Sequence, residues 1–333
     1  MHTRPPTLSQ VAARAGVSLK TASRALNGEP YVSGATGQRV REAADELGYR
    51  LNSLARDLRT GGTSPLVGLI SGDLANPFYS AVASGVEREL RRHGLLLVTA
   101  NSDEDGQLER SLVEALLERR VRALLVVPGG DSREYQRVRD DHGVPFVFLD
   151  RPPAGLAADS VLIDNAGGTQ QAAAHLLAGG HRRIALVADL VRTTSQQARI
   201  DGFTAAMAAA GNPDWEPYLR TGVHDAATAE RTIGDLLALD DPPTALFTTN
   251  NRLTTGALRA LRGLDRPPAL VGFDDFELAD VVGTTVIAHD MTELGRQAAR
   301  LAHERIGGHT GPPRTVVIPT TLIARGSGER PPR

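Results

Sequence analysis

From Pro65 onward, short β-branched runs alternate with amphipathic helical patterns, and this alternation limits the possible fold more than any other feature. The apolar runs cover 66–71, 95–100, 123–127, 146–150, 160–164, 183–188, 244–249, 269–275 and 315–318. The helical patterns between them lie near 77–93, 106–119, 132–142, 167–179, 196–210, 226–239, 252–263 and 290–306. Strands that alternate with such helices form parallel sheets covered on both faces. Two such series predict two similar α/β lobes with a cleft between them.

The first 50 residues show a different pattern, in which short helices are separated by turns. Thr7 and Gln10 have the form of a capping box, which would begin a helix at Leu8. Gly16 permits a turn with positive φ, and Ser18 can cap a second helix. On that helix Ala22, Ala25 and Leu26 share the inward face, and the outward residues are Leu19, Lys20, Thr21, Ser23 and Arg24. This pattern predicts a DNA-binding helix-turn-helix, although an ordinary αα-hairpin would show it too.

The charge distribution favours DNA binding by this first segment. The whole chain has a net charge of −2, but residues 1–60 hold nine basic and five acidic residues, or +4. The remainder holds 28 basic and 34 acidic residues, or −6. A basic head on an acidic body suits a protein that touches DNA at one end only. Lys20 is the only lysine of the chain and lies on the outward face of the second helix.

Several classes of protein and site are excluded by what the sequence lacks. Without cysteine the chain can form neither a disulfide nor a thiolate metal site. It has no apolar signal segment and no stretch long enough to span a membrane, so we expect a cytoplasmic protein. Common nucleotide-binding, metalloprotease and hydrolase motifs are absent, and the nine histidines lack metal-ligand spacing. We therefore predict no catalytic residue, metal or cofactor, and interpret His289–Asp290 as the cap of a helix.

Three motifs make the interpretation of the head specific. The AGVS corner at 15–18, the TASRALN helix at 21–27 and the LGYRLNSLARDL exit at 47–58 closely resemble the DNA-binding head of LacI-family regulators. The resemblance continues more loosely through the remaining chain. It implies an α/β protein in which a small all-α helix-turn-helix head precedes a two-lobed, periplasmic-binding-protein-like body with parallel sheets.

The resemblance also implies domain boundaries. A DNA-binding domain occupies 1–51, a hinge helix and linker 52–63, and a ligand-binding and dimerisation body 64–333. Because the chain of such a body crosses between the lobes three times, the first lobe comprises about 64–163 and 292–322. The second lobe comprises about 164–291 and 323–330.

Family DNA contacts map onto residues of the head and hinge. They are Thr7, Leu8, Ser18, Leu19, Lys20, Thr21, Ser23, Arg24, Asn27, Ser33, Thr36, Tyr49, Asn52, Ala55 and Leu58. Leu19, Lys20 and Arg24 would read base edges, because guanidinium and ammonium groups favour guanine and an apolar group favours the thymine methyl. Leu58 corresponds to the leucine that parts a base step in the minor groove. Judged without the resemblance, Leu58 would be a linker leucine packed against the body. Leu51 departs from the family, which usually has proline there.

The family's ligand contacts map to loops at strand ends, where ligands bind in parallel α/β sheets. They are Asn76, Phe78, Asp150, Arg151, Arg199, Asn250 and Asp274. The alternatives are a proline-started helix with a packed aromatic ring at Asn76–Phe78 and a solvated charge pair at Asp150–Arg151. Asn250–Asn251–Arg252 departs from the Asn-Asp of many relatives, and Arg252 indicates a more anionic or carbonyl-rich ligand.

Together these features predict a sequence-specific transcriptional regulator, a repressor that binds a pseudopalindromic double-stranded DNA operator as a homodimer. A small effector, a carbohydrate by family expectation, would bind in the cleft and control DNA affinity. The alternative is a transport-type solute-binding protein, which shares the two-lobed body. That class needs a signal peptide and has no use for the DNA-binding head. Both points weigh against it.

Overall fold

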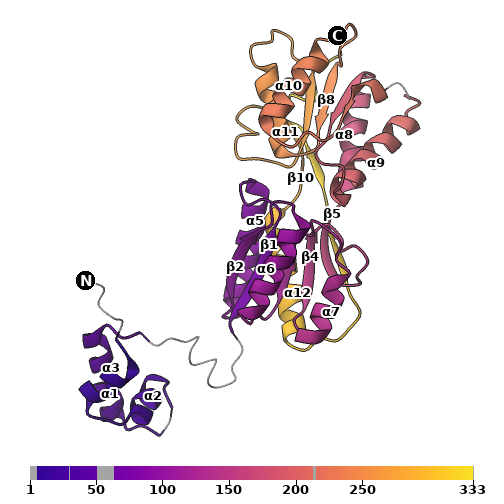
Figure 1. Ribbon diagram of the computed structural model, residues 1–333. Helices are drawn as coiled ribbons and strands as arrows, with labels where there is room; N and C mark the ends of the chain where they lie inside the picture. Colours follow the sequence, from indigo (N-terminus) through magenta and orange to yellow (C-terminus); the bar gives the residue numbers. More distant parts are fainter. Residues whose placement is uncertain (1–5, 30, 51–63, 213–214, 333) are drawn as a thin grey trace. The chain divides into compact units, whose positions relative to one another are not determined.

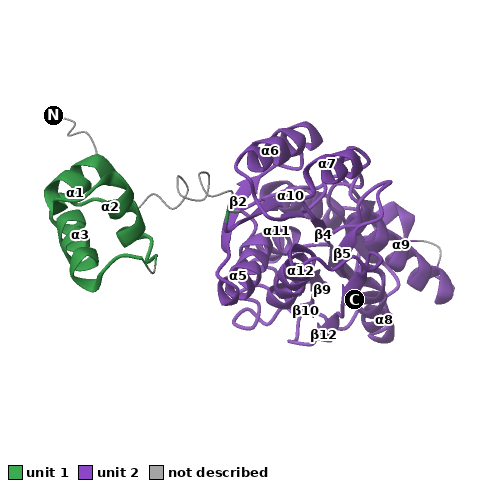
Figure 2. Cartoon of the chain, turned by 90° about the horizontal axis from the view of Figure 1, so that it is seen from below, with its two compact units in different colours: residues 1–64 green, residues 65–333 purple. Residues whose placement is uncertain are grey.

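The computed structural model describes residues 6–29, 31–50, 64–212 and 215–332. The chain forms two compact units, Met1–Ser64 and Pro65–Arg333, which we call the head and the body (Figure 2). The predicted hinge at 52–63, with Asn52, Ala55 and Leu58, lies outside the described residues.

Three helices build the head: α1 (Leu8–Ala15), α2 (Leu19–Leu26) and α3 (Gly34–Leu47). The predicted capping box at Thr7 is present, and Gly16 ends α1 with a φ of 64°. Ser18 caps α2 by accepting a hydrogen bond from the Thr21 amide at 3.1 Å, as the sequence predicts. The buried core consists of small side chains: Val11, Ala12, Ala15, Ala22, Ala25, Val40, Ala43 and Ala44. Such a core lets the three helices approach closely, which fixes the surface that α2 presents.

The first lobe of the body is a six-stranded parallel sheet in the order β11-β5-β4-β3-β1-β2. Its strands are β1 (Leu66–Ser71), β2 (Leu96–Asn101), β3 (Leu124–Val126), β4 (Phe146–Asp150), β5 (Asp159–Ile163) and β11 (Thr315–Ile318). Its helices are α5 (Pro77–Arg92), α6 (Gly106–Glu118), α7 (Glu134–His142) and α12 (Met291–Ile306). α5 and α12 pack on one face, and α6 and α7 pack on the other.

The second lobe repeats this architecture in the order β12-β10-β9-β8-β6-β7. Its strands are β6 (Ile184–Val187), β7 (Leu219–Arg220), β8 (Ala245–Thr248), β9 (Ala269–Phe273), β10 (Thr285–Ala288) and β12 (Thr321–Ile323). Its helices are α8 (Asn165–Ala178), α9 (Thr194–Ala209), α10 (Ala226–Leu237) and α11 (Asn251–Leu261), and a short 3₁₀ turn covers Glu216–Tyr218. α8 and α9 cover one face, and α10 and α11 cover the other. The predicted fold class is therefore confirmed.

The sequence patterns missed three strands, β7, β10 and β12. β7 and β12 span only two and three residues, whereas β10 spans four, as the predicted β11 does. β12 also pairs antiparallel with β10, so the second sheet is not wholly parallel. The chain passes between the lobes after β5, after β10 and after β11 (Figure 1). Because β12 lies in the second sheet, the last passage falls at 319–320, slightly before the predicted bound near 322.

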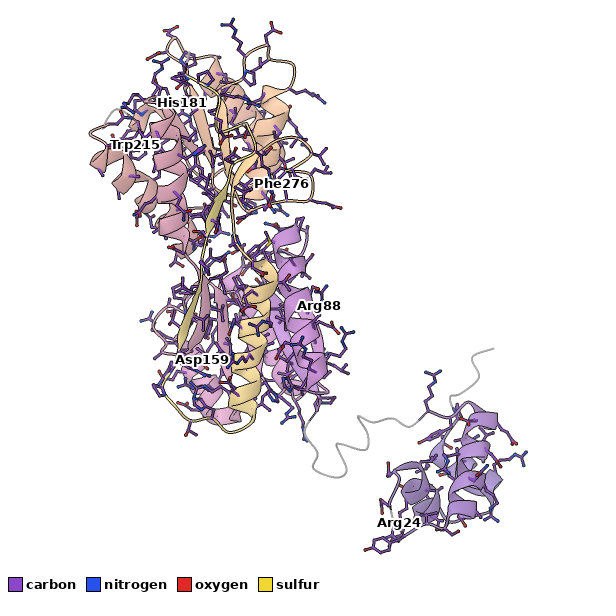
Figure 3. The ribbon with its side chains drawn as sticks, turned by 180° about the vertical axis from the view of Figure 1, so that it is seen from behind. Arg24, Arg88, Asp159, His181, Trp215 and Phe276 are labelled. Carbon is purple, nitrogen blue, oxygen red and sulfur yellow. The ribbon has the colours of Figure 1, made fainter. Side chains whose placement is uncertain are left out.

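The strands are oriented so that their carboxyl ends meet between the lobes. Asp159 begins β5 at the end of the first lobe that is remote from the second lobe, and His181 precedes β6 at the opposite end of the body (Figure 3). The loops that follow the strands therefore face the cleft. Strands such as β4 and β9 are buried along their whole length, which makes these loop positions rigid.

Candidate functional site

The surface of α2 is polar and cationic. Leu19 and Lys20 are exposed, and Thr21, Ser23 and Arg24 are partly exposed, while Ala22 and Ala25 are buried. The predicted contacts Thr7, Ser18 and Ser33 are the N-caps of α1, α2 and α3. Helix N-termini with exposed hydroxyl caps suit the binding of phosphate groups.

Arg24 has a neighbour that the sequence did not indicate. Its Nε atom lies 3.3 Å from Oε2 of Glu29, and both side chains are about two-fifths exposed. Such an exposed ion pair contributes little to stability and breaks readily. Glu29 therefore orients Arg24 on the surface of the head without preventing it from reaching a base.

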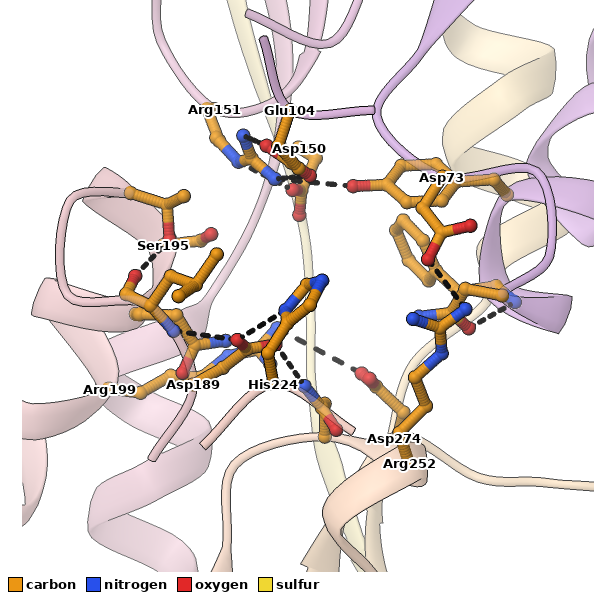
Figure 4. A pocket seen from close by; sticks show the side chains of 17 residues that line it. Asp73, Glu104, Asp150, Arg151, Asp189, Ser195, Arg199, His224, Arg252 and Asp274 are labelled. Carbon is orange, nitrogen blue, oxygen red and sulfur yellow. Dashed lines mark hydrogen bonds and ion pairs between the residues drawn. The ribbon is translucent and has the colours of Figure 1, made fainter. Parts of the chain in front are cut away.

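The candidate cavity of the body lies between the lobes, and the empty space in and around it, open solvent included, amounts to about 580 Å³ (Figure 4). It brings together all seven ligand contacts that the sequence predicts. The first lobe contributes Asp73, Asn76, Phe78, Tyr79, Glu104, Asp150 and Arg151. The second lobe contributes Asp189, Leu190, Thr193, Ser195, Gln196, Arg199, His224, Asn250, Arg252 and Asp274.

Arg199 on α9 is held in a fixed position. Its Nε donates to Asn165 Oδ1 at 2.8 Å, and its Nη1 donates to the carbonyl oxygen of Thr249. Its guanidinium lies over the ring of Phe273, 3.8 Å from the ring centre. Nη2 lies 3.9 Å from Asp274 Oδ1, beyond hydrogen-bond distance. A ligand atom could therefore bind both Arg199 and Asp274.

Asp150 and Asp274 occupy equivalent places in the two lobes. Asp150 ends β4 with a φ of 66°, and Asp274 follows β9 with a φ of 71°. Few residues other than glycine adopt this conformation, and its energetic cost is typical of functional sites. Burial raises the pKa of both carboxyl groups, although Arg151 opposes this for Asp150 and Arg199 for Asp274. Both acids are thus placed and desolvated by the fold rather than by ligand.

Arg151 lines the cavity with Asp150, as predicted, and both side chains are buried rather than solvated, but the donors of Arg151 have protein partners. Its two terminal nitrogens bind Glu104 at 2.5 and 2.7 Å, and one of them also donates to Tyr79 Oη at 3.3 Å. Burial alone would raise the pKa of Glu104, but its hydrogen bonds with Arg151 lower it. Most donors of Arg151 are therefore already used. Glu104 follows β2, and its place at a strand end was the signal that could have identified it.

Asn250 lines the cavity, but its side chain has structural partners. Its Oδ1 accepts from the amide of Leu253 at 2.9 Å, which caps α11, and its Nδ2 donates to Asp189 at 2.7 Å. Asp189 also receives a hydrogen bond from Nδ1 of His224 at 2.8 Å. Asp189 and His224 are not among the ligand contacts that the sequence predicts. Asp189 comes shortly after β6, so the strand-end rule could have found it.

Two contacts join the lobes across the cavity. Arg252 Nη2 lies 2.5 Å from Asp73 Oδ2, and Asn251 Nδ2 donates to Asn76 Oδ1 at 2.9 Å. The cation that distinguishes this chain at Arg252 is therefore neutralised by a carboxylate of the other lobe. The inference of an anionic ligand from Arg252 loses its basis.

His289 lies directly behind the cavity. Asp290 caps α12 as predicted, accepting from the Glu293 amide at 2.8 Å. His289 instead is fully buried between Phe78 and Phe273, and neither ring nitrogen has a hydrogen-bond partner. Burial lowers its pKa to about 4. Its Nε2 lies 3.8 Å from Asp274 Oδ1, which also lacks a partner, so both groups remain available for a polar atom.

The described residues hold neither a metal-binding group of side chains nor a helix that could span a membrane. Among residues 6–29, 31–50, 64–212 and 215–332, no group of three or more His, Asp or Glu side chains is arranged to hold a metal ion. None of the helices in these ranges is long and apolar enough to cross a membrane.

A helix-turn-helix head joined to a two-lobed body with a polar cavity defines a ligand-responsive DNA-binding regulator. Known families agree, since residues 7–52 match bacterial regulatory proteins of the lacI family and residues 173–328 match a periplasmic binding protein-like domain. The HTH-type transcriptional regulator PtxS of Pseudomonas aeruginosa is 35% identical over 332 residues, covering 96% of this chain and 95% of PtxS. The chain therefore belongs to the lacI family and is a DNA-binding transcriptional regulator.

Solved structures show the same architecture over nearly the whole chain. The lac repressor dimer bound to operator and the anti-inducer ONPF has a TM-score of 0.83 and 27% identity, covering 98% of this chain and 99% of its own. The complex of the transcriptional regulator CelR with cellobiose has a TM-score of 0.72 and 32% identity, covering 97% and 100%. These proteins are regulators rather than enzymes, and they do not support the transport-type alternative.

Proposed function

We propose that this regulator represses its target genes by binding a pseudopalindromic operator as a homodimer, and that a small sugar-like effector in the cavity controls operator affinity. It acts in the cytoplasm, where its operator is, and no catalytic step is assigned to the cavity. The observation that carries the effector proposal is the convergence of Asp150, Arg199 and Asp274 from two lobes on one cavity.

The character of the cavity supports a polyhydroxylated effector. Carboxylates accept hydrogen bonds from hydroxyl groups, and a fixed guanidinium donates to their oxygens. The Phe78 ring lines the same space and offers an apolar surface for a sugar face. The CelR complex with cellobiose supports the same class of ligand in a relative of this fold.

The exposed residues of α2 support the operator proposal. Leu19, Lys20 and Arg24 are assigned to base edges, and the cap hydroxyls of Thr7, Ser18 and Ser33 to phosphates. The remaining proposed contacts of the described head are Leu8, Thr21, Ser23, Asn27, Thr36 and Tyr49. The lac repressor dimer bound to operator supports this mode of binding.

An apolar surface of the second lobe supports dimerisation. Leu278, Val281 and Val282 lie in one short segment and expose about half or more of their surface. Leu96, on the edge strand β2 of the first lobe, is also largely exposed. Exposed apolar side chains that cluster in this way commonly mark protein interfaces. A dimer would present two heads to the two halves of an operator.

The contacts between the lobes supply a two-state element. Opening of the cavity must break the Arg252–Asp73 ion pair and the Asn251–Asn76 hydrogen bond. A ligand that contacts both lobes favours the closed state by its differential affinity.

The proposal is tested by selecting DNA that the full-length protein binds from a random pool, and then screening sugars for release or strengthening of the selected complex. We expect enrichment of a pseudopalindrome and a change in its affinity with at least one sugar. A pool without an enriched sequence would refute specific operator binding. An enriched operator that no sugar affects would refute the proposed effector class.

A further inference from the structure

The charges of the cavity restrict the chemistry of its ligand. We infer that the effector carries no acidic group, and that the cavity selects a neutral or amino-substituted polyhydroxylated molecule over sugar acids and sugar phosphates. This inference rests on the proposed function, since it concerns the ligand of the same cavity.

Acidic groups outnumber basic groups around the cavity. Five carboxylates line it, from Asp73, Glu104, Asp150, Asp189 and Asp274, against three guanidinium groups, from Arg151, Arg199 and Arg252. Arg192 is exposed and close enough to Glu104 to lower its pKa, but counting it still leaves an acidic excess. An anionic ligand would therefore enter a site in which acidic groups outnumber basic ones, and this is unfavourable at low local dielectric.

The guanidinium groups are also committed to protein partners. Arg151 binds Glu104 through two nitrogens, and Arg252 binds Asp73 across the cavity. Arg199 keeps two hydrogen bonds to the protein and lies near Asp274. A carboxylate or phosphate could reach Nη2 of Arg199 only beside the Asp274 carboxyl group. It would have to displace a protein partner to gain a donor from the paired nitrogens of Arg151 or from Arg252. Leaving the displaced carboxylate buried without its cation would offset the gain.

The polar atoms that remain free on the cavity side are mostly acceptors. Among the described residues that line the cavity, Asp274 Oδ1 and Gln196 Oε1 are buried acceptors without hydrogen-bond partners. The corresponding donor, Arg151 Nε, lies 3.2 Å from Asp150 Oδ2. Hydroxyl and ammonium groups can donate to such acceptors, but ionised carboxylate and phosphate groups cannot. The hydrogen-bonding potential and the charge of the cavity thus select the same class of ligand.

The test is a competition among charge variants of the same sugars. The full-length protein is equilibrated with a defined mixture of glucose, galactose and ribose, each as the neutral sugar, amino sugar, sugar acid and sugar phosphate. Retained compounds are separated by ultrafiltration and quantified by mass spectrometry at neutral pH. We expect the best neutral or amino member to exceed every acidic member by about tenfold or more.

Equal or greater retention of a sugar acid or phosphate would overturn the inference while leaving a sugar-like effector in place. If the protein retains no member of any class, the proposed effector class fails, and this inference fails with it. These two failures are distinguishable because only the first shows a bound ligand.

Asp73→Asn provides a second test that predicts a gain. This substitution removes the partner of Arg252, so the guanidinium becomes available to an acidic ligand. The retention of acids relative to neutral sugars should rise several-fold. The matched control is Asp275→Asn, which frees Arg325 from a similar carboxylate pair outside the cavity and should leave the ratio unchanged. An unchanged ratio in Asp73→Asn would contradict the role given to the ion pair.

Discussion

Asp274→Asn is the substitution that tests the proposed binding site most directly. The Asp274 side chain is about 5% exposed, and its Oδ1 lies toward Arg199 without a hydrogen-bond partner. A hydrogen bond from ligand to this buried acceptor should contribute about 0.5–1.5 kcal/mol. Its loss predicts roughly 2- to 12-fold weaker effector binding, since 1.4 kcal/mol corresponds to a factor of ten.

The same substitution should not unfold the body. Asparagine tolerates the left-handed backbone conformation that Asp274 adopts at a φ of 71°. Burial raises the pKa of Asp274 above its usual value near 3.8, so the fold disfavours the ionised carboxyl. The stability contributed by such a group is present below its unfolded pKa and is lost as pH rises through the folded pKa. At neutral pH asparagine removes this penalty, and the melting temperature should stay equal or rise.

Calorimetric titration with the effector identified in the sugar screen measures the predicted loss. Asp275→Asn is the matched control, because Asp275 pairs with Arg325 at 2.7 Å and does not line the cavity. Operator affinity without effector should be similar in both variants. If Asp274→Asn binds the effector as tightly as the unaltered protein does, Asp274 is not a ligand contact and the assignment of this site is wrong.

Three further predictions concern the head, the buried histidine and the dimer. Arg24→Ala should weaken operator binding by about 1–3 kcal/mol in gel-shift titrations and relax the preference for one base. The control Arg14→Ala breaks an exposed ion pair between α1 and α3, with Glu46, and should leave the base preference intact. His289 has a pKa of about 4 in the folded protein, against its usual 6.5 in the unfolded chain. Its contribution to the free energy of unfolding is therefore present above pH 6.5 and is lost as the pH falls toward 4. Between pH 6.5 and pH 4, the free energy of unfolding measured in denaturant titrations should fall by about 3 kcal/mol less in His289→Gln than in the parent protein. The control His142→Gln, at an exposed position, should show the same fall as the parent protein. Val281→Asp should shift sedimentation toward monomer and spare effector binding; an unchanged dimer would exclude this surface.

Local features of the head could be predicted because they depend on residues a few positions apart. The Thr7 capping box, the Ser18 cap and the positive φ of Gly16 all involve contacts within one turn of chain. The alternation of apolar runs with helical patterns likewise predicted both sheets. The missed strands β10 and β12 span four and three residues, and they form because neighbouring strands supply their partners.

The candidate site divides in the same way. The rule that polar residues after parallel strands line a cleft correctly placed Asp150 and Asp274 at the cavity, and it would also have reached Glu104 and Asp189. It could not assign partners. Glu104 and Arg151 are 47 positions apart and follow β2 and β4, which β1 and β3 separate in the sheet. Only the folding of these loops over the same edge of the sheet brings the two side chains together.

The sequence by itself determined the class of the protein, the capped helices of its head and the residue types at the ends of its strands. Only the tertiary structure decided which of those side chains remain free. Arg252 looked available to an anion until the approach of the two lobes placed Asp73 beside it. Burial left Asp274 and His289 without partners in the same fold. The physical reason is that ion pairing and desolvation depend on distance in space, which strand order and lobe closure set.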